Sequence, residues 1–581
     1  MKNPIEYARR AAAEVVFAAY EKAAKGGELP RAEVRAPAVE TPKDVRNGDF
    51  SSSFAMQNAK LFRMPPRAAA ETLIKNMELE DTCFASCETA GPGFINFRLA
   101  PKWFSEVLSE IERSGKDYGK TDSPAPEKIM VEFVSANPTG PMHLGNARGG
   151  VLGDSLAEVL SRAGNDVYRE FYVNDAGNQI EKFALSIDTR FMQIIEGEEK
   201  HPFPEDGYHG DDIIDIAKKY IEENGTALAS APQRERMDKL SAFGLNVNLP
   251  KMRADLERYK IFYDRWFCES ELHKSGYVAD TIDKLNKTGY TYEKDGALWL
   301  ATSRILTEKL LREGKSEEEI AKLELKDDVL KRSNGFYTYF AVDIAYHRNK
   351  FEERKFDRVI NIWGADHHGH VARLKGALDV LGLDGEHRLE IVLMQLVRLT
   401  RDGEVVRMSK RTGKAISLSD LLDEISVDAA RYFFNSRAAD THLEFDLGLA
   451  VRTDSENPVY YVQYAHARIK SILRALAGEG IDLDSPADYS LLSSESEIEL
   501  IRELAKLPEE IRLAAEAREP SRLNRCASET ATAFHKFYTE CRIKDIEDEK
   551  LRAARIGLIK ATATVIENTL SAFGVTAPDR M

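Results

Sequence analysis

The sequence predicts a multidomain α/β protein with a parallel β-sheet at its centre, a small α+β domain before it and an all-α bundle after it. The chain has 581 residues, more than one hydrophobic core can hold, so we expect about three or four domains. In its middle, short apolar runs alternate with helical segments, a pattern typical of parallel strands with helices on both faces. The runs are "IMVEFV", "DVYREFYVND", "RVINIWGADHHGH" and "RLEIVLMQLV".

The pattern changes along the chain and so divides it into three predicted domains. Residues 1–115 contain a leading helix, a Pro- and charge-rich stretch and the apolar strand "GFINFRL", and they end in a linker rich in Gly, Ser and Pro. Residues 116–440 contain the alternating runs, interrupted at about 190–330 by a charged and mostly helical insertion. Residues 441–581 are helical almost throughout, which predicts a separate bundle.

Composition argues against several classes of protein. Apolar residues make up 43% and charged residues 30% of the chain, as in ordinary globular proteins. The five cysteines are few and scattered, so we expect neither a disulfide framework nor a protein-bound zinc. The net charge of −15 argues against a surface built uniformly for nucleic acid but permits a local basic groove. Acidic residues at helical intervals near the N-terminus predict an amphipathic helix, so we expect a cytoplasmic protein without membrane contact.

The segment "MVEFVSANPTGPMHLGNARGG" joins the first central strand to a glycine-rich helix. In a parallel sheet the ligand crevice lies at the carboxyl ends of the strands, where the next helix offers free N–H groups and the positive end of its dipole to an anion. His143 and Asn146 lie three residues apart, on one face of the first helical turn, as two hydrogen-bond donors. Gly145 lacks a side chain, so a flat ligand can approach. By itself the pattern also fits a helix-capping histidine with packing glycines.

A basic segment, "LTRDGEVVRMSKRTGK", follows the last predicted strand. "RDGE" is a hairpin-type turn. The loop after it contains basic residues and no acid, which suits a clamp for polyphosphate, although a solvated basic loop has the same composition. Its residues include Arg407, Met408, Ser409, Lys410, Arg411 and Lys414.

Together, "HLGN" and "RMSKR" resemble the two signatures of class I aminoacyl-tRNA synthetases, a His-Ile-Gly-His type motif and a Lys-Met-Ser-Lys-Ser type loop. Asn146 replaces the second histidine and Arg407 replaces the first lysine, but both substitutes still donate hydrogen bonds. The resemblance implies a Rossmann-type catalytic domain that binds ATP, with Mg²⁺ carried by the nucleotide. It implies catalytic roles for His143, Asn146 and Lys410, and ATP contacts from these three together with Gly145, Met408 and Ser409.

Longer stretches resemble the arginyl-tRNA synthetase family over essentially the whole chain. They include "SANPTGPMHLGN", "FYVNDAGNQI", "YTYFAVDIAYHRNKF", "GADHHGHVARLKGAL", "NPVYYVQYAHARI" and "TAPDRM". The resemblance implies ATP-dependent ligation of L-arginine to tRNA(Arg) through an arginyl-adenylate, by an enzyme we expect to be a monomer. It also implies that activation needs the tRNA and that the N-terminal domain contacts the tRNA elbow.

A guanidinium ion needs planar, anionic acceptors in a partly dry pocket, because an unpaired buried charge is costly. Tyr339 and Asp343 lie four residues apart, so they share a face if the segment is a helix. Such a pair also occurs on helix surfaces, but the resemblance implies that Asp343 accepts the guanidinium with Tyr339 beside it. Glu269 matches a second acidic position of the family. Ser135 and Asn137 resemble groups that hold the amino and carboxylate ends of the substrate.

The run "GADHHGH" has two interpretations. His367, His368 and His370 are close enough in sequence to suggest a metal site, but adjacent histidines at a strand-to-helix turn point in different directions. The alternative is that Gly364 and Asp366 form the family's ribose-binding turn, with the carboxylate accepting from a hydroxyl. His367 then lies near ATP or the arginine carboxylate, and it is assigned to both sites.

The stretch "ENPVYYVQYAHARIK" begins the C-terminal bundle, with Asn457 as a helix cap and Pro458 in the first turn. Tyr460, Tyr464 and Arg468 interleave aromatic and cationic side chains, which suits splayed RNA bases, although tyrosines at helical spacing are also typical of a core. The resemblance places anticodon recognition in this bundle. Two other functions remain open from sequence: another adenylyl- or nucleotidyl-transferring enzyme, and a non-catalytic tRNA-binding relative.

Overall fold

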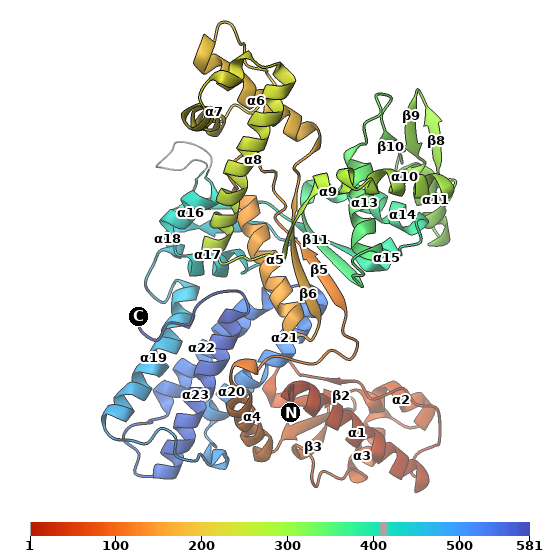
Figure 1. The fold of residues 1–581 in the computed structure, drawn as a ribbon. Helices are drawn as coiled ribbons and strands as arrows, with labels where there is room; N and C mark the ends of the chain where they lie inside the picture. Colours follow the sequence, from red (N-terminus) through yellow and green to blue (C-terminus); the bar gives the residue numbers. More distant parts are fainter. Residues whose placement is uncertain (1, 402, 407–415) are drawn as a thin grey trace.

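The structure is a computed structural model that describes residues 2–401, 403–406 and 416–581. Figure 1 shows an N-terminal part and a C-terminal helical bundle flanking one end of a central sheet, with two inserted bodies near its other end. Among the described residues, no helix is both apolar and long enough to cross a lipid bilayer.

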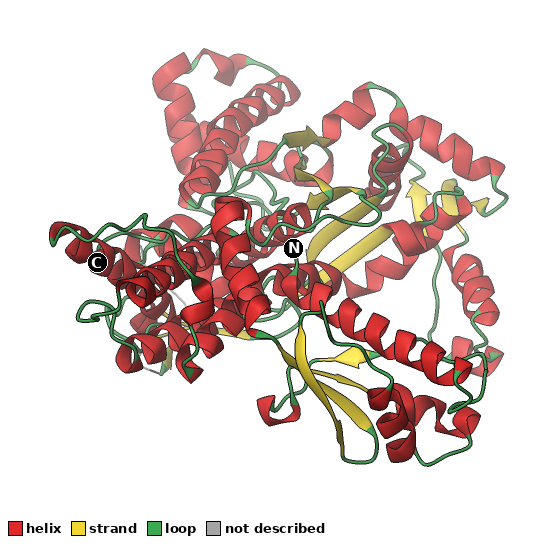
Figure 2. Ribbon diagram, turned by 90° about the horizontal axis from the view of Figure 1, so that it is seen from below, coloured by secondary structure: helices red, strands yellow, loops and turns green. Residues whose placement is uncertain are grey.

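The N-terminal part packs helices against a four-stranded antiparallel sheet (Figure 2). The predicted leading helix is present, capped by the side chain of Asn3 and buried along a stripe from Ala8 to Ala23 at intervals of three or four residues. The predicted strand "GFINFRL" is also present, as β4. The elements are α1 (Pro4–Lys25), β1 (Val39–Glu40), β2 (Phe50–Ser52), α2 (Phe54–Phe62), α3 (Pro66–Lys75), β3 (Phe84–Ala90), β4 (Phe94–Leu99) and α4 (Pro101–Ser114).

The central sheet has five parallel strands in the order β12-β11-β5-β6-β7. Its β5 strand alternates between the two faces: Ile129 and Val131 pack in the core that contains α5, whereas Met130 packs in the core that contains α13 and α14. Helices therefore cover both faces, and the predicted parallel sheet is confirmed. The elements are β5 (Lys128–Glu132), α5 (Leu144–Arg162), β6 (Asp166–Val173), β7 (Arg265–Cys268), α13 (Tyr339–Glu352), β11 (Arg358–Gly364), α14 (His368–Val380), α15 (Gly385–Arg388) and β12 (Leu389–Met394).

The expectation of one mostly helical insertion at 190–330 is wrong, because the chain returns to the sheet in the middle of that range as β7 and α9 (Glu269–Lys274). The strand was missed because it is a short edge strand in which only Phe267 is fully buried. The first inserted body is helical: α6 (Gly177–Glu196), α7 (Asp211–Asn224) and α8 (Gln233–Arg258). The second contains an antiparallel sheet: α10 (Tyr277–Lys287), β8 (Thr291–Lys294), β9 (Ala297–Leu300), α11 (Thr302–Arg312), α12 (Glu317–Ala321) and β10 (Asp328–Lys331).

A small sheet and a helical bundle complete the chain. The predicted "RDGE" turn lies between β13 and β14, whose residues Arg401 and Glu404 pair. The predicted helix start is confirmed, since Asn457 caps α19 and Pro458 is its first residue. The elements are β13 (Val397–Arg401), β14 (Glu404–Val405), α16 (Leu418–Glu424), α17 (Val427–Phe434), β15 (Leu443–Asp446), α18 (Leu447–Ala450), α19 (Pro458–Gly478), α20 (Glu495–Ala505), α21 (Leu507–Ala517), α22 (Arg522–Glu540) and α23 (Glu549–Ser571).

A buried arginine ties the bundle to the central domain. The Arg431 side chain is fully buried and forms an ion pair with Asp154 of α5. Its guanidinium also donates to the carbonyl oxygens of Tyr259, at 3.0 Å, and Phe573, at 2.8 Å. One cation therefore connects α5, the segment after α8 and the segment after α23.

Candidate active site

The strand order places the candidate site between β5 and β11. From β5 the chain adds β6 and β7 on one side and then returns to add β11 and β12 on the other. At such a switch point the connections that leave the two central strands diverge, and the crevice between them is the usual ligand site of an open parallel sheet. Here the connections are residues 133–143 after β5 and residues 365–367 after β11.

The connection after β5 ends at His143, the N-cap residue of α5. Asn146 Oδ1 accepts from the backbone N–H of His143 at 3.0 Å, so the amide oxygen caps the helix while the NH₂ group is left to donate. A Cβ at Gly145 would lie 3.2 Å from the His143 ring, so glycine keeps the space beside the imidazole. The His143 side chain is exposed at the mouth of the crevice, yet nearby protein atoms desolvate the ring and lower its pKa. The imidazole is therefore neutral near pH 7.

The start of the same connection is strained. Val134 and Ser135 have φ values of +67° and +41°, a region that side-chain-bearing residues rarely adopt. Ser135 Oγ donates to Glu132 Oε1 at 3.0 Å and accepts from the backbone N–H of Tyr172 at 3.1 Å. The Ser135 hydroxyl thus already holds β5 and β6 together, while Asn137, two residues on, is exposed. These contacts fix the backbone that enters the crevice.

The connection after β11 separates the histidines of "GADHHGH". The side chains of Asp366 and His367 are 82% and 59% exposed, and Gly364 has no Cβ to collide with the Asp366 carboxylate. His370, on α14, instead places Nε2 2.7 Å from Asp343 Oδ2. Within the described parts of the chain, no cluster of three or more His, Cys, Asp or Glu is arranged to hold a metal ion.

Asp343 lies on α13 between two histidines. His347 Nδ1 is 3.0 Å from Asp343 Oδ1, and His370 contacts the other carboxylate oxygen. Desolvation alone would raise the pKa of Asp343, but its charge interactions and hydrogen bonds with both histidines outweigh burial and hold the pKa well below its usual range. A carboxylate has about four lone-pair positions, so two remain for another donor. The Asp343 side chain is 25% exposed, which leaves it within reach of one.

Glu269 and Tyr339 line a common cavity of about 550 Å³. The Glu269 side chain is only 4% exposed and accepts from the Tyr172 hydroxyl at 2.7 Å. Tyr339 is 47% exposed, and desolvation of its hydroxyl raises its pKa. The lining includes Val342 but not the next residue, Asp343, which follows one helical turn after Tyr339. The lining is completed by Ala176, Gly177, Asn178, Glu181, Arg234, His273, Arg332, Asn334, Gly335, Phe336, Tyr337 and Thr338.

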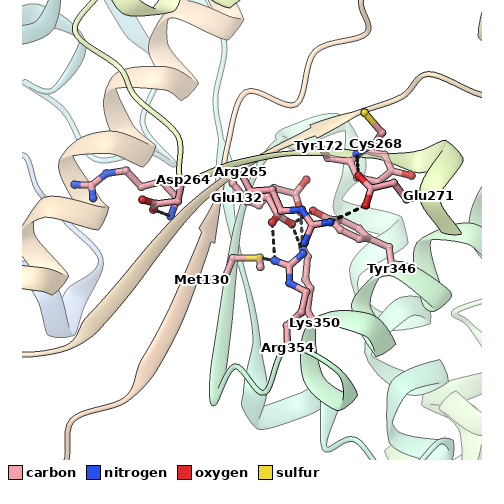
Figure 3. Close-up of polar contacts among 12 residues, drawn as sticks. Met130, Glu132, Tyr172, Asp264, Arg265, Cys268, Glu271, Tyr346, Lys350 and Arg354 are labelled. Carbon is pink, nitrogen blue, oxygen red and sulfur yellow. Dashed lines mark hydrogen bonds and ion pairs between the residues drawn. The ribbon is translucent and has the colours of Figure 1, made fainter.

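A buried polar chain links the two halves of the site. His347 Nε2 accepts from the Asn361 amide at 2.8 Å, and Lys350 Nζ lies 3.3 Å from Asn361 Oδ1. Lys350 also donates to Glu132 at 2.5 Å, an ion pair between α13 and β5 seen in Figure 3. Glu132 in turn holds Ser135. The sequence analysis did not single out Glu132, His347, Lys350 or Asn361. Two of them could have been noticed, because Glu132 and Asn361 are polar residues inside the otherwise apolar strands β5 and β11.

Arg148, in the second turn of α5, was also missed. Its fully buried guanidinium donates to the carbonyl oxygens of Gln395 at 2.7 Å and of Ala438 and Thr441 at 2.9 Å. Burial lowers the pKa of Arg148 to about 10. Arg148 therefore connects the start of α5 to the segment after β12 and to the segment after α17.

The remaining candidates lie elsewhere. Tyr460, Tyr464 and Arg468 are on α19 in the C-terminal bundle (Figure 1). The two tyrosine rings stack with centroids 6.2 Å apart, and the Arg468 guanidinium lies 5.9 Å from the Tyr464 ring. Tyr464 is 38% exposed. The predictions for Met408, Ser409 and Lys410, and the motif departure at Arg407, concern positions outside the described residues.

Comparison with known families identifies each part of the chain. Residues 107–446 match the family described as "tRNA synthetases class I (R), catalytic domain". Residues 11–99 match "Arginyl tRNA synthetase N terminal domain", and residues 462–581 match "DALR anticodon binding domain". The parallel sheet with its central switch point and the match over the catalytic region define a class I aminoacyl-tRNA synthetase.

Relatives narrow the class. The chain is 51% identical to an arginine–tRNA ligase of Acetivibrio thermocellus and 48% identical to one of Ruminiclostridium cellulolyticum, in each case over 100% of both chains. Its fold matches the solved arginyl-tRNA synthetase of Thermus thermophilus with a TM-score of 0.72 at 21% identity, over 99% of this chain and 100% of that one. The chain belongs to the arginyl-tRNA synthetase family.

Proposed function

We propose that this protein ligates L-arginine to its cognate tRNA in an ATP-dependent reaction that passes through an arginyl-adenylate. One observation carries the proposal: a helix N-terminus suited to an anion and a cavity lined by the buried carboxylate of Glu269, which suits a guanidinium, both lie at the carboxyl edge of the same sheet. Family membership and relatives of equal length support the same reaction.

We assign the nucleotide to the switch point. The neutral imidazole of His143 and the free amide of Asn146 suit donation to the α-phosphate region, and Gly145 leaves room for the ligand. Gly364, the exposed Asp366 and His367 suit the ribose side, with Mg²⁺ carried by ATP. From sequence we add Met408, Ser409 and Lys410; their segment continues into Ser417, whose backbone pairs with that of His143.

We assign the arginine substrate to the cavity lined by Glu269 and Tyr339. Asp343 and Glu269 offer two carboxylates to a guanidinium, with the Tyr339 hydroxyl beside them. An analogue without the guanidinium would leave these buried acceptors unpaired, a penalty that gives selectivity of about 10⁴ or more. Ser135 and Asn137 are proposed for the amino and carboxylate ends. The Ser135 hydroxyl already has two protein partners, so its share is mainly to position the loop.

Neither chemical step requires a side-chain nucleophile. In the first, a carboxylate oxygen of arginine attacks the α-phosphorus of ATP and pyrophosphate leaves. In the second, a terminal ribose hydroxyl of the tRNA attacks the arginyl carbonyl and AMP leaves. The protein therefore acts by aligning the reactants and by neutralising charge on the phosphate oxygens, as His143, Asn146 and Lys410 are proposed to do.

We assign tRNA contacts to the parts outside the sheet. Tyr460, Tyr464 and Arg468 form a partly exposed group of aromatic rings and a cation on α19, suited to unstacked anticodon bases. We propose the division 1–115, 116–440 and 441–581 into an elbow-binding, a catalytic and an anticodon-binding domain, acting as a monomer.

ATP–pyrophosphate exchange with each amino acid, with and without tRNA(Arg), tests the proposal. We expect exchange with arginine alone among the amino acids, and only when tRNA is present. Exchange with no amino acid, in a protein that still retains tRNA on a filter, would indicate a non-catalytic tRNA-binding relative. Exchange that neither uses tRNA nor transfers an amino acid to it would indicate another nucleotidyl-transferring enzyme.

A further inference from the structure

Phe336 presents a large aromatic ring to solvent at the rim of the cavity that also contains Glu269 and Tyr339. It is 71% exposed. An apolar ring of this size is normally buried, because burial is favourable in proportion to the apolar area removed from water. Single exposed apolar residues occur on most protein surfaces, so exposure alone does not indicate a binding site. The position of the Phe336 ring beside the cavity is what suggests one.

The turn that carries Phe336 has a backbone fixed by several hydrogen bonds. It connects β10 to α13 and is closed by a β-bridge between Lys331 and Tyr337. The Arg332 backbone N–H donates to the Phe336 carbonyl at 2.9 Å, and Asn334 Oδ1 accepts from the Phe336 N–H at 3.2 Å. Gly335, with φ of +87°, supplies the left-handed conformation that the turn requires. These contacts fix the backbone from which the exposed ring extends.

The cavity is larger than a free amino acid requires and lies between the two inserted bodies. Gly177 and Glu181 of α6 and Arg234 of α8 form one wall, and the turn with Arg332 and Phe336 forms the other. Arg234 is already paired with Glu181 at 2.8 Å and with Asp238 at 3.0 Å, whereas Arg332 extends from the exposed turn. The wall with the exposed ring therefore also carries a cation, a combination that suits a nucleotide.

Transfer of arginine from the adenylate to the tRNA requires the terminal nucleotide of the tRNA to come close to this cavity. A ribose hydroxyl can attack the arginyl carbonyl only if the two are held within about 3–3.5 Å, so the terminal base of the tRNA must lie next to the amino-acid site. The base is single-stranded there and has an exposed π-face. Within the lining of the cavity, Phe336 has the most exposed aromatic ring, at 71%, compared with 47% for Tyr339.

We propose that Phe336 is the stacking platform for the terminal base of the tRNA, with Arg332 facing the adjoining phosphate. The inference rests on the proposed function and adds to it a specific contact for the transfer step. When an aromatic side chain that stacks on one base is replaced by alanine, the affinity falls by about 5- to 150-fold.

The test uses the full-length protein with Phe336→Ala, Phe336→Trp and Phe262→Ala. Phe262 is 61% exposed, lies between α8 and β7 and does not line this cavity, so it is the matched control. We expect Phe336→Ala to raise the KM for tRNA in aminoacylation by about 5- to 150-fold. Phe336→Trp restores the wild-type KM, and Phe262→Ala leaves it unchanged.

A tRNA lacking its terminal nucleotide makes the assignment specific. The effect of Phe336→Ala on affinity vanishes on this truncated tRNA if the ring contacts the terminal base. A tRNA with 2-aminopurine as its terminal base gives the direct signal: its fluorescence is quenched on binding the wild-type and Phe336→Trp proteins and not on binding Phe336→Ala.

Two results would overturn the inference while leaving the proposed function intact. They are equal quenching by wild type and Phe336→Ala, and an equal loss of affinity for intact and truncated tRNA. Failure of the wild-type protein to charge tRNA with arginine would instead reject the proposed function. Thermal unfolding midpoints within a degree or so of wild type establish that the variants are folded.

Discussion

Asp343 shows how single residues at this site are kept in the protonation state that the chemistry needs. Two histidines lie at 3.0 Å and 2.7 Å from its carboxylate oxygens, and they hold its pKa far below the usual value despite burial. Because the folded pKa is depressed, the stability this group contributes is present above its unfolded pKa of about 3.9 and is lost as pH falls through the folded value. Asp343 therefore stays ionised throughout the range in which the enzyme is expected to work.

Asp343→Asn should weaken arginine binding specifically. Removing one partner of a buried charge pair costs about 2–5 kcal/mol, so the KM for arginine rises roughly 30-fold or more. In wild type the KM should show no rise from Asp343 protonation between pH 5 and 8, since its pKa lies well below this window. Steady-state aminoacylation measures both effects. Asp280→Asn, which alters an exposed partner of Arg348, is the control, and an unchanged KM in Asp343→Asn would reject the pocket.

His143→Ala should slow arginine activation with little change in tRNA affinity. Removing a donor that stabilises developing charge costs about 3–4 kcal/mol, or at least a hundredfold in rate. Lys410→Ala is expected to act in the same way. Single-turnover activation and filter binding separate the two quantities, and a wild-type activation rate in either variant would remove that residue from the mechanism.

At the scale of elements, a buried ion pair sets the position of α13 against β5. The Lys350 side chain is fully buried and that of Glu132 is 8% exposed, and they meet at 2.5 Å. Glu132 also holds the strained loop that leads to His143. The helix that carries Asp343 and the strand that leads to His143 are therefore fixed to each other.

Lys350→Met should destabilise the central domain by about 3–5 kcal/mol, because it leaves the Glu132 charge buried without its partner. The double variant Lys350→Met with Glu132→Gln should recover part of this loss, which double-mutant analysis of chemical denaturation measures. Lys284→Met, which breaks the more exposed pair with Glu352, serves as the comparison and should cost about 1 kcal/mol or less. Equal losses in Lys350→Met and Lys284→Met would contradict the assigned role.

The elements also show what sequence can and cannot predict. Apolar runs predicted the strands β5, β6, β11 and β12, and a capping residue predicted the start of α19. Both signals lie within a few consecutive residues, so they can be read from the sequence. The edge strand β7 was missed because half-exposed strands lack a continuous apolar run. Local pattern placed Tyr339 and Asp343 on one helix, but the contact between Asp343 and His370 depends on how α13 packs against α14, which no local spacing encodes.

At the scale of the whole molecule, Arg431 joins three segments that are distant in sequence. Asp154 lies on α5, the helix that His143 caps, and Phe573 lies after α23. A Cβ at Gly574 would collide with the Arg431 guanidinium, so glycine is required there for close approach. Arg431 therefore connects the end of the bundle to α5, the helix that follows His143.

Arg431→Met should lower the stability of the whole protein by about 3–5 kcal/mol, because Asp154 loses the buried one of its two arginine partners and two carbonyl oxygens lose their donor. Arg452→Met, which removes a largely exposed pair with Asp454, should cost no more than about 1 kcal/mol. Thermal unfolding and limited proteolysis report the difference. Equal thermal unfolding midpoints for Arg431→Met and Arg452→Met would contradict the role of Arg431 in joining the bundle to the central domain.

The same junction has a consequence for biosynthesis. Phe573 leaves the ribosome long after α5, and until it does, the Arg431 guanidinium lacks one of its acceptors. A polypeptide without this segment would then hold α5 less firmly at Asp154, on the helix whose first turn is proposed to bind ATP. Competence to activate an amino acid would thus arrive only after α23 has been translated.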